Sequence, residues 1–225
     1  MHETLVRARS IERSYGSGAE QVKAVTDATF SVKAGDTVAL LGPSGSGKST
    51  LLHLLAGLDA PTSGSIEWPA LGGRQDLRPG RVGMAFQGPS LLPPLTVVEN
   101  VALPMILGGA EQDDATDAAL DLLEVFEIAA VADKLPEELS GGQSERAGIA
   151  RAFSGSPRLV LADEPTGQQD RATGGGVLEA ILTVAVLGGA ALVVATHDAA
   201  VAERLTSRWV MRDGTLRTDE LTCSS

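Results

Sequence analysis

One stretch of the sequence decides the fold: Gly42-Pro43-Ser44-Gly45-Ser46-Gly47-Lys48-Ser49-Thr50. The apolar run 37–41 before it predicts a short buried strand, and the apolar run 51–56 after it predicts a helix. A strand, a glycine-rich loop and a helix in this order are the context that a phosphate-binding loop requires. Glycines let successive backbone N–H groups point at an anion, and the helix start adds its positive dipole end. The stretch therefore predicts a nucleotide-binding site.

Two side chains in this stretch have the chemistry that a nucleotide needs. Lys48 is expected to reach the β- and γ-phosphates, and the hydroxyl of Ser49 is expected to ligate Mg²⁺. A plain glycine–serine linker would contain the same glycines. The Lys-Ser-Thr run followed by an apolar helix argues against a linker, so we expect bound nucleotide and Mg²⁺.

Composition limits the classes of protein that this chain can represent. With 225 residues, of which 43% are hydrophobic and only 3% aromatic, the core must be built from Val, Leu, Ile and Ala. A net charge of −11 argues against a nucleic-acid-binding surface. The single cysteine, Cys223, leaves no disulfide framework and no cysteine-based metal site, which fits a reducing compartment.

No segment of the sequence is predicted to enter a membrane. The polar start of the chain, with an early acidic residue, does not have the pattern of a secretory signal. The longest apolar stretch, 181–195, is interrupted by Gly188-Gly189 and is too short to span a bilayer. If the protein works at a membrane, we expect another chain to supply the membrane part.

The rest of the chain alternates predicted strands and helices. Two early β segments, Leu5–Ser14 and Val22–Val32, predict an N-terminal antiparallel β region. Later strands are expected at 65–68, 82–86, 159–162 and 191–196, with a hairpin at 209–217. Helices are expected to start at the capping residues Thr96 and Ser140 and to span 173–187.

This alternation predicts an α/β fold with a parallel core sheet, which binds ligands beyond the carboxyl ends of its strands. The candidate site residues Lys48, Gln87, Asp163 and His197 all follow predicted strand ends. We therefore expect one site at that edge.

An acidic segment interrupts this pattern. Residues 111–138 contain ten carboxylates and a single lysine. Apolar residues at helical spacing predict the buried face of a helix, formed by Ala115, Ala118, Ala119, Leu122, Val125 and Phe126. We interpret the segment as part of a helical insertion at approximately 88–155 within a single domain, with its acidic face in water.

Tyr15, the only tyrosine, lies in the glycine-rich turn between the first two β segments. Its ring could stack on a purine base, or it could be an ordinary aromatic residue in a turn. From the residues alone, the two interpretations are equally good.

Six features in order resemble the nucleotide-binding subunits of ABC transporters. They are the aromatic Tyr15, the Walker A loop Gly42–Thr50, the Q-loop Gln87, the signature Leu139–Gln143, the Walker B carboxylates Asp163-Glu164 and the switch histidine His197. The signature is highly specific to this family. Residues 86–101 are also similar to the subgroup of ATPases from lipoprotein-releasing, macrolide-exporting and cell-division complexes.

The resemblance implies a P-loop ATPase of the ABC type and a role for each residue. Ser49, Gln87 and Asp163 would hold Mg²⁺, Glu164 would polarise the attacking water, and His197 would contact the γ-phosphate. Nucleotide would also be contacted by Tyr15, by the whole Walker A loop and, from a second subunit, by the signature residues Ser140, Gly141, Gly142 and Gln143.

The resemblance also implies partners and a location. We expect an ATP-dependent homodimer, or a heterodimer with a similar ATPase, that drives or gates a membrane-spanning permease from the cytoplasmic face of the membrane. Two alternatives remain: a mechanical signalling subunit that controls an extracellular enzyme or sensor through a membrane partner, and an ABC ATPase that moves nothing. The second usually resembles tandem ATPase domains or has coiled-coil or basic insertions, unlike this chain.

Some positions depart from the family pattern. Gly148 lies inside the signature helix, where it should cost about 1 kcal/mol of helix stability relative to Ala. Gln169 replaces the usual Leu before Asp170, and the segment 68–81 is shorter than in most of the subgroup.

The loop after Gln87 contains an apolar cluster with two possible roles. Its residues either pack the insertion onto the sheet or form an exposed docking site for the permease; they are Leu91, Leu92, Pro93 and Leu95.

Overall fold

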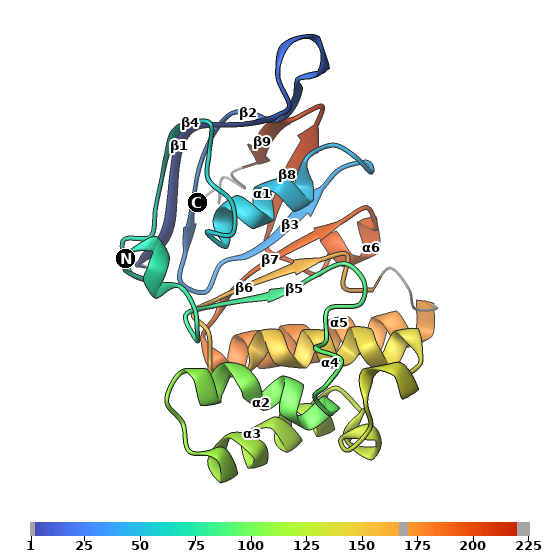
Figure 1. The fold of residues 1–225 in the computed structure, drawn as a ribbon. Coiled ribbons are helices and arrows are strands. Elements are labelled where there is room, and N and C mark those ends of the chain that lie inside the picture. Colours follow the sequence, from blue (N-terminus) through green and yellow to red (C-terminus); the bar gives the residue numbers. More distant parts are fainter. Residues whose placement is uncertain (1–2, 167–170, 220–225) are drawn as a thin grey trace, which may run out of the picture. The chain divides into compact units, whose positions relative to one another are not determined.

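The computed structural model describes residues 3–166 and 171–219 (Figure 1). These residues belong to two compact units. The first unit comprises Met1–Leu77 with Ala191–Ser225, and the second comprises Arg78–Ala190. Two residues that the sequence analysis singled out, Gln169 and Cys223, lie outside the described residues.

The first unit begins with the expected antiparallel β region. Strand β1 (Thr4–Tyr15) pairs antiparallel with both β2 (Val22–Lys33) and β4 (Ser63–Glu67). Leu5, Val6, Ala8 and Ile11 of β1 are buried, while the intervening polar residues are more exposed. This partial alternation is typical of a sheet with one face against a core, and it positions Tyr15 at the end of β1.

The same unit contains the parallel strands that carry the phosphate-binding loop. Strand β3 (Thr37–Leu41) lies between β7 (Ala191–Thr196) and β8 (Ser207–Arg212) and runs parallel to both. Strand β9 (Thr215–Asp219) forms the expected hairpin with β8. Within this unit the strand order is β4-β1-β2-β9-β8-β3-β7.

Four short helical segments lie among the residues that the structure describes in the first unit. Helix α1 (Lys48–Leu55) follows β3, and α6 (Ala199–Ala202) follows β7. The other two are the single 3₁₀ turns Gly18–Glu20 and Arg74–Asp76. Helix α1 begins three residues before its apolar run, because Gly47 caps it in a left-handed conformation (φ 105°).

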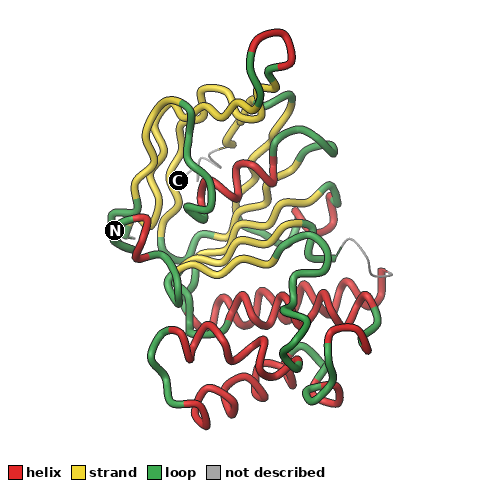
Figure 2. The backbone as a smooth tube through the Cα atoms, in the orientation of Figure 1, coloured by secondary structure: helices red, strands yellow, loops and turns green. Residues whose placement is uncertain are grey.

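The described part of the second unit contains a parallel strand pair and four longer helices. Figure 2 draws the strands in yellow and the helices in red. Strand β5 (Val82–Ala85) pairs with β6 (Leu159–Asp163). The helices are α2 (Val97–Leu107), α3 (Gln112–Val125), α4 (Gly141–Phe153) and α5 (Arg171–Gly188), with 3₁₀ turns at Ala129–Val131 and Pro136–Glu138. Helix α2 packs against α3 and α4, and α4 packs against β5.

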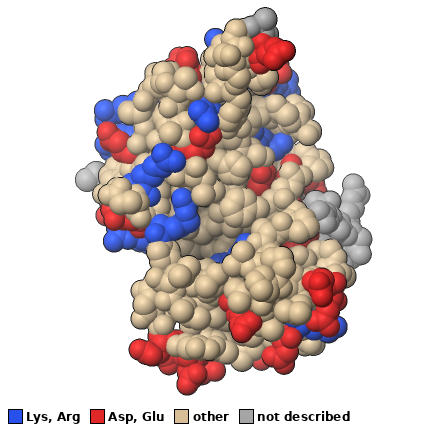
Figure 3. Space-filling model, in the orientation of Figure 1, with Lys and Arg blue, Asp and Glu red and all other residues tan. Residues whose placement is uncertain are grey.

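Helix α3 has the expected acidic face, but its buried face is rotated from the predicted one. In Figure 3 acidic side chains gather over the helices of this unit. Ala115, Ala119 and Phe126 are buried as expected, together with Leu123, which was not predicted. The prediction that Val125 is buried is wrong. Val125 is 45% exposed and lines a groove with Met105 and Leu187.

The apolar residues of the loop between β5 and α2 differ in their exposure. Leu92 is 42% exposed, whereas Leu91 packs into the core at 9% exposure. Leu91 therefore belongs to the fold, and of this pair only Leu92 presents a largely accessible side chain.

Among residues 3–166 and 171–219, no helix combines the length and the apolar character needed to cross a bilayer.

The N-terminus of α2 has the predicted capping box. The carboxylate of Glu99 accepts hydrogen bonds from the backbone N–H of Thr96 (2.7 Å) and from its hydroxyl (2.9 Å). Glu99 N–H in turn donates to Thr96 Oγ1 at 3.4 Å. The hydrogen bonds from Thr96 lower the pKa of Glu99 below its ordinary value of 4.5.

We expect Thr96→Ala to lower the free energy of unfolding by about 1 kcal/mol at neutral pH, because the first turn of α2 loses its cap. Since the folded-state pKa of Glu99 is depressed, its stabilising contribution is present above its unfolded pKa and is lost as the pH falls through the folded pKa. The penalty should therefore shrink at pH values below 4.5. Thermal unfolding across this pH range measures it.

Thr116→Ala is the matched control, because the hydroxyl of Thr116 donates to Gln112 O (2.8 Å) inside α3 and caps no helix. A Thr96→Ala variant no less stable than this control would contradict the assigned role of the capping box.

Candidate nucleotide-binding site

The phosphate-binding loop is packed so closely that two of its glycines cannot be replaced without moving the backbone. A Cβ atom on Gly42 would collide with the carbonyl oxygen of Met211 in β8. A Cβ atom on Gly47 would collide with the carbonyl oxygen of Ala24 in β2. The N–H of Gly214 also donates to Ser46 O at 3.1 Å. The loop is therefore shaped by the strands behind it.

The polar groups of this loop suit an anion. The ammonium of Lys48 is buried and donates to Gly42 O (2.8 Å) and Pro43 O (3.2 Å), so it lies across the loop at the start of α1. Ser46 Oγ is buried and has no hydrogen-bond partner among the described residues. Such an uncompensated hydroxyl, beside a helix N-terminus and a lysine, fits a phosphate group.

His197 lies at the same sheet edge as the phosphate-binding loop. Leu41, the last residue of β3, pairs with Thr196, the last residue of β7. The segments that begin at Gly42 and His197 therefore leave adjacent strand ends. The side chain of Asp198 caps α6 by accepting from Ala200 N–H (2.8 Å), while His197 itself is exposed.

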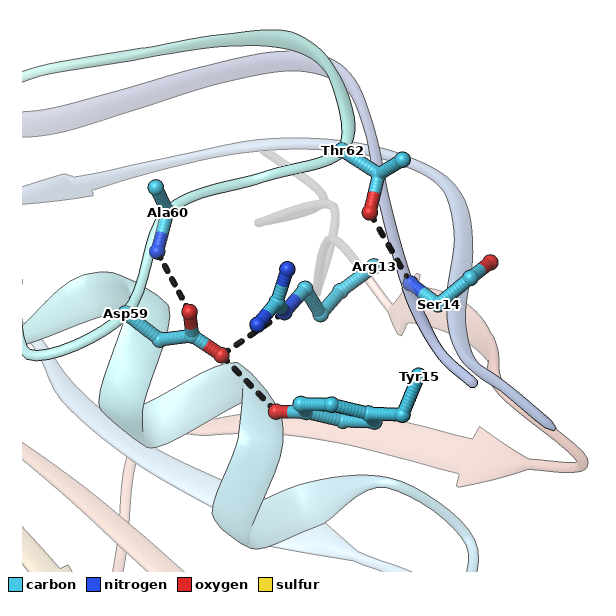
Figure 4. Close-up of polar contacts among 6 residues, drawn as sticks. All are labelled: Arg13, Ser14, Tyr15, Asp59, Ala60 and Thr62. Atoms are coloured by element: carbon cyan, nitrogen blue, oxygen red, sulfur yellow. Dashed lines mark hydrogen bonds and ion pairs between the residues drawn. The ribbon is translucent and has the colours of Figure 1, made fainter. Parts of the chain in front are cut away.

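Tyr15 is held by a polar cluster outside the core (Figure 4). Its hydroxyl donates to Asp59 Oδ2 (2.8 Å), and the Arg13 guanidinium lies over the ring, 4.5 Å from its centre. Arg13 Nε also donates to Asp59 Oδ2 (2.8 Å). The ring remains 41% exposed, so it is restrained but accessible.

In the second unit, the parallel pairing of β5 and β6 brings the expected Q-loop and Walker B residues to one edge. Ala85 pairs with Ala162, so Gln87 and Asp163 follow neighbouring strand positions. Asp163 is 5% exposed, and Gln87 is exposed. Glu164 has φ 50°, a left-handed conformation that is uncommon and costly for a residue with a side chain.

The loop after Gln87 is anchored by two residues that the sequence analysis did not identify. Asn100, fully buried in α2, donates from Nδ2 to Leu92 O (3.1 Å) and Leu95 O (3.0 Å). Arg151 in α4 donates to Ser90 O (2.8 Å) and Ser90 Oγ (3.0 Å), and burial lowers the pKa of this guanidinium. Both are polar residues at core-facing positions of a helix, and this pattern could have identified them from the sequence.

These bonds also give Gly148 a structural role. A Cβ atom on Gly148 would lie 3.2 Å from Ser90 Oγ, which already accepts from Arg151. The glycine in the signature helix thus leaves room for the serine of the Q-loop, which offsets its low helix propensity.

The signature segment forms the capped start of α4, as predicted. Ser140 Oγ accepts from Gln143 N–H (3.3 Å), and Gln143 Oε1 accepts from Ser140 N–H (3.0 Å). Gly141 is exposed, and Gly142 is half-buried. A helix start has N–H groups without partners inside the helix, so this end can receive an anion.

The donors expected to hold Mg²⁺ are all oxygens, which a hard cation requires. Ser49 lies half-buried in the first turn of α1, and Gln87 and Asp163 lie at the carboxyl edge of the β5–β6 pair. Within the described residues, no three or more His, Cys, Asp or Glu side chains group as a metal site. A sparse set of this kind suits Mg²⁺, which is usually bound by one or two carboxylates and by substrate phosphates.

Comparison with known proteins identifies the family. Residues 25–167 match the model of the ABC transporter family. The chain is 39% identical over 223 residues to the lipoprotein-releasing system ATP-binding protein LolD of Legionella pneumophila (strain Paris), covering 96% of this chain and 98% of that protein.

Solved structures agree with this assignment. The dimeric ATP-binding cassette MJ0796, in a post-hydrolysis state bound to ADP and Pi, has a TM-score of 0.89 and 33% identity, covering 98% of this chain and 100% of that chain. CbiO1 from Clostridium perfringens, part of the transporter complex cbiONQ, has a TM-score of 0.80 and 25% identity, covering 96% of this chain and 87% of that chain. The predicted α/β P-loop fold is confirmed.

The curated relative is named an ATP-binding protein, and the cassette MJ0796 is solved in a post-hydrolysis state with ADP and Pi, which agrees with the nucleotide site that the phosphate-binding loop predicts. The chain belongs to the ABC transporter family as an ATP-binding subunit with ATPase activity.

Proposed function

We propose that this chain hydrolyses ATP at the cytoplasmic face of a membrane in order to power or gate a separate membrane-spanning permease. The observation that carries the proposal is the phosphate-binding loop. Its backbone lies against β2 and β8, and Lys48 lies across its opening. That arrangement offers backbone donors, a helix N-terminus and a cation to a triphosphate.

The roles of the individual residues follow from the charge and placement of their side chains. Lys48 neutralises charge on the phosphates, the backbone N–H groups of Gly45–Thr50 orient them, and the exposed ring of Tyr15 stacks on the base. Ser49, Gln87 and Asp163 hold Mg²⁺, which supplies further charge neutralisation on the phosphate oxygens. His197 donates a hydrogen bond to the γ-phosphate.

Glu164 acts as the base in the hydrolytic step. Its carboxylate accepts a proton from the water that attacks the γ-phosphorus, and the bond from that phosphorus to the bridging oxygen of ADP breaks. General-base assistance of this kind is worth roughly 10²–10⁴-fold in rate. The left-handed backbone of Glu164 supports this role, because strained residues often occur where a side chain must point in one direction.

The complete site needs a second ATP-binding subunit, either another copy of this chain or a similar ATPase. The capped start of α4 presents Ser140 and the following glycines as an anion-binding terminus. We propose that this terminus contacts the ATP held by the partner. The dimeric state of the related cassette MJ0796 supports the proposal.

The permease is proposed to dock on the insertion at approximately 88–155, next to the loop that follows Gln87. Leu92 supports this location because its side chain is exposed while Asn100 holds its backbone in place. The likeness to a protein of a lipoprotein-releasing system supports a transport role.

We expect Lys48→Ala to weaken ATP binding by more than about tenfold, because the loop loses its only lysine. We expect Glu164→Gln to retain ATP binding and to lower the hydrolysis rate by roughly 10²–10⁴-fold, because the amide cannot accept the proton. Equilibrium ATP binding and phosphate release, measured on both variants, separate the two roles.

Sedimentation of the Glu164→Gln chain with MgATP adds a second readout, because ATP that is not hydrolysed should hold two chains together as a dimer. Near-normal turnover by Glu164→Gln would refute the assignment of the base. A chain that stays monomeric with MgATP, even with its permease present, would refute the shared site.

We expect Leu92→Asp to abolish stimulation of the ATPase by the permease and to leave basal hydrolysis unchanged, because the substitution alters an exposed apolar contact. Reconstituted complexes, assayed with and without permease, measure this. Val186→Asp is the matched control, since Val186 is 70% exposed in α5, outside the proposed docking region. Normal stimulation of the Leu92→Asp chain would move the docking site elsewhere.

A further inference from the structure

The ring of Tyr15 is held at its hydroxyl and over one face. The hydroxyl of Tyr15 is bound to Asp59, and Arg13 covers one face of the ring (Figure 4). Arg13 and Tyr15 are two residues apart on β1, so their side chains point to the same side of the sheet. A ring that is covered on one face and still 41% exposed has surface left for a stacking partner.

Asp59 is in turn fixed by the helix that follows the phosphate-binding loop. Its own backbone N–H donates to His53 O (3.2 Å), in the last turn of α1. Its side chain accepts from Ala60 N–H (2.7 Å) as well as from Tyr15 and Arg13. Asp59 therefore has little freedom relative to α1.

The charge state of Asp59 favours this arrangement. Burial alone would raise the Asp59 pKa, but the hydrogen bonds from Tyr15, Ala60 and Arg13 outweigh burial and hold the pKa below its usual value. Asp59 is thus ionised at neutral pH. Hydrogen bonds to a charged acceptor are stronger than those between neutral groups.

We propose that Asp59, supported by Arg13, is a positioning residue that holds the Tyr15 ring ready to stack on the base of the bound nucleotide. Because α1 carries Lys48 and Ser49 in its first turn and holds Asp59 just beyond its last, the helix links the phosphate subsite to the base subsite. The inference rests on the proposed stacking role of Tyr15.

An unrestrained ring would lose rotational freedom when a base stacks on it, and that loss would weaken binding. The hydrogen bond to Asp59 and the contact with Arg13 restrict the ring before nucleotide arrives. This restriction should increase affinity only for ligands that have a base, because the phosphate subsite does not depend on the position of the ring.

We expect Tyr15→Phe, which removes only the hydroxyl, to weaken ATP binding by about three- to tenfold. Asp59→Ala should have a similar effect. Neither variant should change the affinity for inorganic tripolyphosphate, which has no base. Calorimetric titration of the full-length variants with both ligands measures the difference.

Asp36→Ala is the matched control. Asp36 also accepts a backbone hydrogen bond, from Lys33 N–H (2.7 Å), but Lys33 lies at the opposite end of the β1–β2 pair from Tyr15. It should leave both affinities unchanged. In a Tyr15→Ala background, Asp59→Ala should cause no further loss of ATP affinity, because a positioning residue then has nothing to position.

The single tyrosine also provides a spectroscopic readout. NMR signals of a selectively labelled Tyr15 ring should shift on addition of ATP, and the shift should shrink in the Asp59→Ala chain. Unchanged or tighter ATP binding by Tyr15→Phe, with weaker binding by Tyr15→Ala, would overturn the positioning role. Unchanged ATP binding by Tyr15→Ala would instead overturn the stacking role on which it rests.

Discussion

The close approach of the phosphate-binding loop to the strands behind it is the constraint on which the site depends. Gly42 and Gly47 leave no room for a Cβ atom, because the carbonyl oxygens of Met211 and Ala24 lie against them. A side chain at either position would therefore push the loop away from β2 or β8. Lys48 and Ser49 are presented at a defined place because the first turn of α1 starts from that loop.

The same helix carries this constraint to the other end of the nucleotide. Asp59 binds back to the last turn of α1 and holds Tyr15, so one short helix relates the groups proposed to bind phosphate and base. In the second unit, Arg151 and Asn100 play a comparable part by fixing the loop between Gln87 and α2. In both units, polar contacts hold a candidate site residue or the loop beside one.

Most of the strands and the parallel core could be predicted, because runs such as 37–41, 159–162 and 191–196 are short and uniformly apolar. The start of α1 was placed too late since Lys48, Ser49 and Thr50 have no apolar periodicity. Val125 was predicted to be buried in place of Leu123, because helical periodicity cannot tell which of two adjacent apolar faces meets the core. The partners of Asn100, Arg151 and Asp59 lie far away in sequence or in irregular loops, so no local pattern could reveal them.

The most direct test compares ATP affinity in Gly42→Ala and Gly45→Ala chains. A Cβ atom on Gly42 meets Met211 O, whereas one on Gly45 meets nothing within 4 Å and is disfavoured only by its positive φ of 78°. If close packing shapes the loop, Gly42→Ala should lose ATP affinity by well over about tenfold, and Gly45→Ala should lose less, since a left-handed alanine costs roughly 1–2 kcal/mol. Wild-type ATP affinity in the Gly42→Ala chain would contradict this account.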